Sequence, residues 1–233
     1  KRLSIFVLRA KAKVADVSDV WSTYGLLGEG SELLQDAGLS LPASPWASTS
    51  TDNGRVDRVL ATPKGVARFL LTLPRESHLS LLDSTERASS NTWWLSEIDA
   101  AVPTIFAATQ EKFVPQMINL EVLGGVDFKK GCYPGQEIVA RSQYLGKLKR
   151  RMNVADVDAS DVHAGADVFH NGAAQPIGTV VMAAASTPEA EGSALLFEAP
   201  LDRLESGSLH LKGVDGPRLV VRPLPYALFD PTE

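Results

Sequence analysis

The stretch KKGCYPGQEIVAR, residues 129–141, contains the only cysteine of the 233-residue chain. Two lysines precede Cys132, and Pro134 suits the first turn of a helix that continues through residue 141. Cations and a helix N-terminus both stabilise a thiolate, which is the reactive form of cysteine. The stretch therefore predicts a loop that enters a helix and carries a thiol kept for chemistry. The alternative is a small apolar side chain that is simply buried.

The residues before this stretch predict one helix and one irregular passage. Residues 90–105, SNTWWLSEIDAAVPTI, carry apolar side chains at helical spacing from Trp94 to Val102, and Pro103 ends the pattern. Residues 113–128, FVPQMINLEVLGGVDF, predict a loop or a short helical passage, because two glycines interrupt them.

The residues after it, 151–233, consist of short β-type runs separated by Gly, Asp, Asn or Pro. Such runs at close, even spacing are typical of a small antiparallel β-barrel. The six runs are RMNVADV, ADVFHNG, IGTVVMAAAS, SALLFEA, GSLHLKG and RLVVRPLP.

Residues 1–84 predict a small α+β domain of ferredoxin-like type. Residues 11–18 and 19–30 suggest strands, and 55–74 suggest a hairpin around Pro63-Lys64-Gly65, with a loop over 40–54. Helices are expected over 1–10, 31–39 and 76–84. Because the first of these has no N-cap and the chain starts with lysine, we expect part of the natural protein to precede residue 1.

Composition and charge exclude several classes of protein. The chain is 44% apolar and 22% charged, which is ordinary for a globular protein. No apolar run reaches the roughly 18 residues of a membrane span. One cysteine allows no internal disulfide, which favours a reducing compartment, and no cysteine pair or histidine cluster has metal-ligand spacing. His78, His163, His170 and His210 are scattered, so no metal site is expected.

The motif LysGlyCysTyrProGlyGlnGlu at residues 130–137 resembles the signature Lys-Gly-Cys-Tyr-x-Gly-Gln-Glu of the YgfZ family. These proteins are folate-binding relatives of T-protein, the aminomethyltransferase of the glycine cleavage system. Residues 113–151 are similar to that family throughout, and PLPYALFD, residues 223–230, resembles its closing segment. The resemblance implies a three-domain cloverleaf. Its parts would be a ferredoxin-like domain (1–84), the second half of a discontinuous folate-binding domain (85–150) and a C-terminal β-barrel (151–233).

The resemblance also implies a function. Family members have a tetrahydrofolate-dependent role in the maturation or repair of iron–sulfur enzymes, including one that thiomethylates tRNA, in the bacterial cytoplasm. The expected cofactor is tetrahydrofolate or a substituted reduced folate, and the expected partners are iron–sulfur client or assembly proteins. The residues that would act in catalysis are Cys132, Lys130, Tyr133, Gln136 and Glu137. Those that would bind the pterin are Trp93 and Trp94, and helical phase places Trp94 with the core residues and turns Trp93 away.

Two features leave other functions open. The family often has Ala-Gly-Ile-Pro where this chain has Ala100 to Pro103, so a methyl group at Ala101 stands where a backbone approach is expected. An aminomethyltransferase is one alternative. An RNA-binding module is another, suggested only by the basic residues Arg141, Lys147, Lys149, Arg150 and Arg151. With a net charge of −5, direct nucleic-acid binding is not expected, and a solvated or domain-joining face is the preferred interpretation of the run.

Overall fold

The computed structural model describes residues 7, 11–30, 34–35, 38–76, 85–133, 135–144, 148–186 and 191–228. The chain divides into two compact units, residues 1–88 and 89–233, and each is considered by itself. The helix expected over 1–10 and most of those expected over 31–39 and 76–84, with His78, lie outside the described residues. The predicted domain boundaries near residues 84 and 150 stay predictions.

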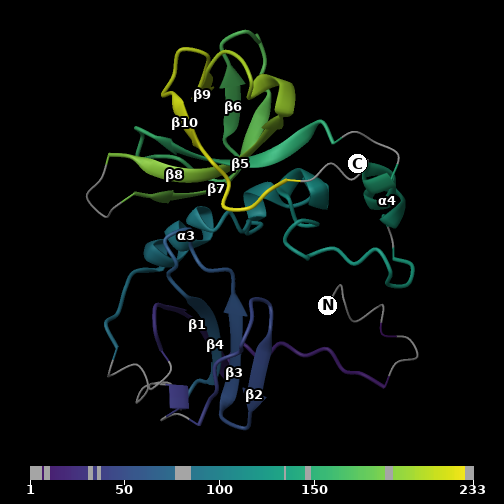
Figure 1. The fold of residues 1–233 in the computed structure, drawn as a ribbon, viewed down its shortest axis with the longest axis vertical. Helices are drawn as coiled ribbons and strands as arrows, with labels where there is room; N and C mark the ends of the chain where they lie inside the picture. The colour runs from purple at the N-terminus through teal and green to yellow at the C-terminus, as the bar shows by residue number, and fades with distance from the viewer. Residues whose placement is uncertain are drawn as a thin grey trace. The chain divides into compact units, whose positions relative to one another are not determined.

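The first unit contains a four-stranded antiparallel sheet. Its strands are β1 (Trp21–Leu27), β2 (Ser48–Thr51), β3 (Gly54–Val59) and β4 (Arg68–Pro74), in the order β1-β4-β3-β2 (Figure 1). The hairpin predicted around residues 63–65 is confirmed, because Val59 pairs with Arg68. The ferredoxin-like description of this unit stays a prediction.

Two expectations for the first unit were wrong. Residues 11–17 form no strand, although they contain β-branched side chains, because every one of them is exposed and pairs with no strand of the described chain. The expected loop over 40–54 contains β2, whose Thr49 pairs with Val56. Strand formation depends on a partner and a buried face more than on composition, which explains both errors.

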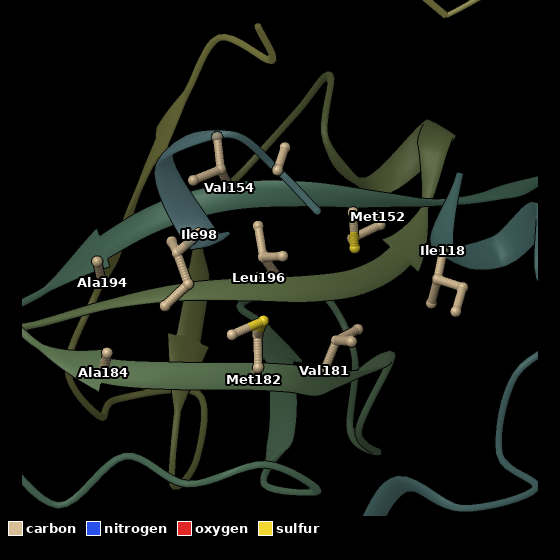
Figure 2. Close-up of a cluster of buried hydrophobic side chains, with 10 residues drawn as sticks. Ile98, Ile118, Met152, Val154, Val181, Met182, Ala184, Ala194 and Leu196 are labelled. Carbon is tan, nitrogen blue, oxygen red and sulfur yellow. The ribbon is translucent and has the colours of Figure 1, made fainter. Parts of the chain in front are cut away.

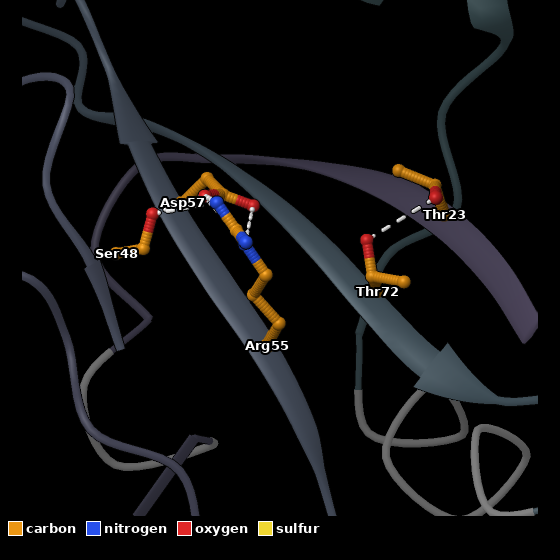
Figure 3. A network of polar contacts seen from close by, with 5 residues as sticks. All are labelled: Thr23, Ser48, Arg55, Asp57 and Thr72. Carbon is orange, nitrogen blue, oxygen red and sulfur yellow. Dashed lines mark hydrogen bonds and ion pairs between the residues drawn. The ribbon is translucent and has the colours of Figure 1, made fainter. Parts of the chain in front are cut away.

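The sheet of the first unit has one apolar face and one polar face. Val56 is fully buried among Phe69, Leu71 and Leu73, whereas its neighbours Arg55 and Asp57 point to the other side. Figure 3 shows the polar contacts there: Arg55 Nε lies 2.8 Å from Asp57 Oδ1, and Ser48 Oγ also donates to that carboxylate. This alternation is the two-residue period of a strand with one buried face.

The second unit is built on a six-stranded antiparallel sheet. Its strands are β5 (Arg150–Val157), β6 (Asp167–His170), β7 (Gly178–Ala185), β8 (Ser193–Pro200), β9 (Leu209–Leu211) and β10 (Leu219–Arg222). Their order is β10-β5-β8-β7-β6-β9, and a bridge between His210 and Arg218 joins the two ends, so the sheet is a nearly closed barrel. All six predicted strands are present, and the barrel is confirmed.

Two helical elements, α3 (Ser90–Asp99) and the 3-10 turn η3 (Pro115–Ile118), cover one face of this sheet. The other helical elements are the 3-10 turns η2 (Ala107–Thr109) and η4 (Leu201–Arg203), and α4 (Gln136–Tyr144), which contacts η3. The predicted helix at 90–105 and the helical passage within 113–128 are both confirmed. Figure 2 shows Ile98 of α3 and Ile118 of η3 in one cluster with Met152, Met182 and Leu196 of the sheet.

Strand β8 is buried along almost its whole length because both faces of the sheet are covered. Leu196 belongs to the cluster under the helices, whereas Leu195 and Phe197 point into the barrel interior. Each such fully buried side chain contributes roughly 1.5–3 kcal/mol. Helix α3, which carries Trp93 and Trp94, therefore packs directly on this buried sheet, whereas α4 is joined to it through η3.

Candidate functional site

Cys132 lies in an exposed loop directly before α4. The chain enters the helix through a reciprocal contact: Tyr133 N donates to Gln136 Oε1 at 3.2 Å, and Gln136 N donates to the Tyr133 carbonyl at 3.2 Å. The side chain of the first helical residue, Gln136, thus caps the loop that leads into α4. Gly135 between them has a φ of 85°, which glycine adopts without strain. Gln136 therefore has a positioning role at the loop that presents the thiol.

Lys130 and Tyr133 lie on either side of Cys132 in sequence and meet in space. Lys130 Nζ is 4.4 Å from the centroid of the Tyr133 ring, which is a cation–π contact. Glu137 is exposed in the first turn of α4, where the helix dipole favours a negative charge. The structure thus joins Lys130, Tyr133 and Gln136 by contacts next to the exposed Cys132 in the chain, and Glu137 follows in the first turn of α4. Their roles in catalysis stay predictions.

The loop and α4 are anchored at two points. Gln116 Nε2 donates to the Val139 carbonyl at 2.8 Å in a buried contact that fixes α4 to η3. The rings of Phe128 and Tyr144 meet edge to face with centroids 5.9 Å apart, so the start of the loop contacts the end of the helix. Residues 128–144 therefore form a closed loop–helix element.

The two predicted pterin-binding tryptophans have different surroundings. Trp94 packs against the cluster that contains Ile98, and its ring meets Phe106 edge to face at 5.5 Å, as the helical phase predicted. Trp93 is half-buried on α3. Trp94 therefore has a packing role, and Trp93 is the better candidate for a ring contact with a ligand.

A buried polar cluster lies beneath these elements, and the sequence reasoning missed it. Arg151 and Glu121 form an ion pair with side chains only 3% and 1% exposed, and Arg151 Nη1 also donates to the Gln116 carbonyl at 3.0 Å. Asn119 Nδ2 donates to the Met152 carbonyl at 2.9 Å. The signal was present, since Gln116, Asn119 and Glu121 interrupt an otherwise apolar passage.

Tyr226 connects this cluster to the end of α3. Its hydroxyl donates to the Ala101 carbonyl at 2.8 Å and accepts a weaker contact from Asn119 Nδ2 at 3.4 Å. Burial raises the pKa of Tyr226 to about 12, and the contact with Asn119 opposes that rise. Tyr226, which lies in the segment 223–230 that the resemblance singled out, thus contributes a partly buried side chain to the unit.

Three acceptor oxygens of the cluster are buried without a hydrogen-bond partner among the described residues. They are Gln116 Oε1, Asn119 Oδ1 and Glu121 Oε2. An unpaired buried acceptor costs about 1–3 kcal/mol, so each of these oxygens is suited to an N–H or O–H donor from water or a ligand.

Ala101 occupies a backbone position that glycine favours. Its φ is 49°, and it follows the C-cap Ala100 of α3 in a Schellman arrangement, where Val102 N donates to the Glu97 carbonyl and Ala101 N to the Ile98 carbonyl. In this chain Ala101 replaces the glycine of Ala-Gly-Ile-Pro. Its buried methyl group therefore lies on a residue whose backbone is in the left-handed conformation. The α3 terminus forms nonetheless.

Within the part of the chain that the structure describes, no group of acidic, cysteine or histidine residues could hold a metal ion. The same residues include no helix long and apolar enough to cross a membrane.

Comparison with solved structures defines the class of fold. Glycine cleavage system aminomethyltransferase T from Bartonella henselae superposes with a TM-score of 0.61 over 87% of this chain and 59% of its own length, at 17% identity. At that identity the match shows the fold alone. The chain has the mixed α/β fold of the T-protein aminomethyltransferases.

Sequence comparison identifies the family more closely. The tRNA-modifying protein YgfZ of Vibrio atlanticus (strain LGP32) is 33% identical over 168 residues, which are 70% of this chain and 47% of that protein. The chain belongs to the YgfZ family, related to T-protein, and the resemblance predicted from residues 130–137 is confirmed. It spans about half the length of the curated relative that it matches. No family model matches the chain.

Proposed function

We propose that the chain binds a reduced folate and acts in the maturation or repair of iron–sulfur enzymes, including tRNA-modifying enzymes. The observation that carries the proposal is the exposed Cys132 in the family motif, held by the helix cap at Gln136. The name of the Vibrio relative, a tRNA-modifying protein, supports the link to tRNA modification.

The thiol of Cys132 would act together with a partner protein. An iron–sulfur cluster usually takes four protein ligands, so one thiolate does not hold a cluster by itself. Cys132 would supply one ligand of a shared site, a nucleophile or a redox thiol. Lys130 and Tyr133 would border the reacting sulfur, Gln136 would position the loop, and Glu137 would favour the helix entrance or move a proton.

The reduced folate, tetrahydrofolate or a substituted form, would supply one-carbon carrier chemistry when bound. Trp93 would contact the face of the pterin, with Trp94 packed behind it in the core.

We also propose the finer architecture that the family implies. It has three domains in a cloverleaf, over residues 1–84 (ferredoxin-like), 85–150 and 151–233. The proposed location is the bacterial cytoplasm, and the proposed partners are iron–sulfur client or assembly proteins.

Calorimetric titration with tetrahydrofolate tests the folate assignment. Trp93→Ala should weaken binding by about 1–3 kcal/mol, the range for a lost stacking contact. Trp46→Phe, at a half-exposed tryptophan of the first unit, is the matched control and should leave the dissociation constant unchanged. Equal affinity of wild type and Trp93→Ala would rule out this role for Trp93.

Complementation tests the role of the thiol. Cys132→Ser should fold normally and bind folate, because the residue is exposed and the pterin contacts come from elsewhere. It should fail to restore iron–sulfur enzyme activity in cells that lack the native protein. Full rescue by the serine variant would exclude the proposed chemistry of Cys132.

An aminomethyltransferase is the second candidate, because the solved structure described above is one. Tetrahydrofolate-dependent release of a one-carbon unit from an aminomethyl-lipoyl donor is the assay. Turnover that persists in Cys132→Ser would favour this function over the accessory role.

A further inference from the structure

The loop–helix element of residues 128–144 exposes an unusual number of rings. The side chains of Phe128 and Tyr144 are 36% and 64% exposed although the two rings touch, and Tyr133 is half-buried beneath Lys130. A single exposed apolar side chain is ordinary, but a group of rings gathered on one surface element is a candidate binding site. Three rings within 17 residues therefore indicate a binding surface.

The same element and the residues that follow it are rich in positive charge. Residues 129–151 contain seven lysines and arginines against Glu137 alone, in a chain whose net charge is −5. Arg150 and Arg151 are paired with Glu198 and Glu121, so they are not part of the free charge.

Lys129, Lys130 and Arg141 are exposed and have no acidic partner in the described chain. The exposed basic residues thus differ from the basic run of residues 141–151 in the sequence. They lie next to the rings in the chain, whereas much of that run lies at the start of β5. We call the set Phe128, Lys129, Lys130, Tyr133, Arg141 and Tyr144 the ring–cation surface.

We propose that the ring–cation surface binds single-stranded RNA. Rings that stack on bases, set among cations that contact phosphates, are what sequence-tolerant single-strand binding requires. A duplex hides the faces of its bases, so it would use only the cations. An acidic protein segment would also be attracted by the cations, and the competition and Ile138→Ser experiments below distinguish it from RNA. The proposal does not depend on folate binding or on Cys132.

Fluorescence anisotropy with a labelled oligouridylate of about 12 nucleotides tests the proposal, since such a length exceeds one stacking site. Phe128→Ala and Tyr144→Ala should each weaken binding about 5- to 150-fold, as expected for one lost stacking contact. Phe128→Tyr and Tyr144→Phe should keep the affinity. Lys129→Ala should lower the slope of log affinity against log salt by about 0.7, the value for one phosphate contact to a single strand.

Two controls separate stacking from charge and from protein docking. Lys112→Ala removes an exposed lysine outside the surface and should change nothing. Ile138→Ser removes a 60% exposed aliphatic side chain of α4 that a protein partner would cover, and RNA affinity should stay within about twofold. Thermal unfolding of each variant shows that it is folded.

Three results would overturn the proposal. The first is no RNA binding even at about 50 mM salt, where phosphate contacts are strongest. The second is equal competition by poly-glutamate at the same charge, which would indicate a generic acidic or protein partner. The third is a loss in Ile138→Ser as large as that in Phe128→Ala. Since none of the tested variants alters the proposed folate contacts or Cys132, failure here leaves the proposed function intact.

Discussion

Replacing Tyr226 by phenylalanine isolates one buried hydroxyl group. The hydroxyl donates to the Ala101 carbonyl at 2.8 Å and receives a weak contact from Asn119. Asn119 keeps its stronger bond to the Met152 carbonyl, so the main loss falls on Ala101, which is buried. The phenylalanine ring fills the same space, and the change therefore tests the hydrogen bond rather than the packing.

The expected loss of stability near pH 8 is about 1–3 kcal/mol. A net hydrogen bond contributes about 1 kcal/mol, and a buried carbonyl left without a donor adds a desolvation penalty of similar size or larger. Tyr144→Phe is the matched control, because its hydroxyl is exposed and makes no hydrogen bond among the described residues. That variant should stay within about 0.5 kcal/mol of wild type.

The same substitution has a signature at high pH. Because the pKa of Tyr226 is raised to about 12 in the folded protein, its contribution is complete below the unfolded value, about 10, and is lost as pH rises through the folded value. At about pH 11 the wild type has lost roughly 1.4 kcal/mol of this contribution, since one pKa unit corresponds to that energy. Tyr226→Phe has no such loss, so the gap between the two proteins should narrow by that amount.

Urea denaturation followed by circular dichroism at about pH 8 and about pH 11 measures both effects. The reasoning fails if Tyr226→Phe matches wild-type stability at the lower pH, because the hydroxyl would then contribute nothing. It also fails if the gap is unchanged at the higher pH, because burial would then not oppose ionisation of this group.

Three further changes test other parts of the structure. Glu121→Ala leaves Arg151 buried without its partner and should cost about 3–5 kcal/mol in chemical denaturation, whereas Asp202→Ala, in an exposed pair, should cost under about 1 kcal/mol. Gly178→Ala places a Cβ in steric conflict with the Glu198 carbonyl oxygen and should cost about 1–3 kcal/mol, against no measurable loss for Gly131→Ala, where the space is open. Hydrogen bonds from Arg55 lower the pKa of Asp57, so its contribution is present above about pH 4 and is lost as pH falls further. Asp57→Asn should therefore flatten the acid side of the stability profile, and an unchanged profile would contradict this role.

Secondary structure was predicted correctly where the local sequence pattern agreed with the way the segment packs in the folded chain. The barrel strands were predicted correctly because each short β-type run between turn residues has a neighbouring run with which it pairs. The helix from Ser90 was predicted from its apolar spacing, and the placement of Trp94 in the core followed from the same phase. Residues 11–17 and 48–51 were predicted wrongly because a strand exists only where a partner strand is available.

The motif at residues 130–137 specified its family and the loop–helix form, because the turn glycines, the proline and the capping glutamine act over a few residues. The sequence by itself therefore determined which residues surround the thiol. It could not determine what lies beneath them. Gln116, Asn119 and Glu121 looked like polar residues of a loop, and Arg151 looked like part of a solvated basic run.

Only the tertiary structure decided which of these groups are buried and which stay exposed. It placed Arg151 against Glu121 and Tyr226 against Ala101, contacts that join residues 30 and 125 positions apart. It left Lys129, Lys130 and Arg141 exposed beside uncovered rings. Burial and charge pairing depend on contacts between distant parts of the chain, and a side chain's type fixes neither its partner nor its solvent exposure.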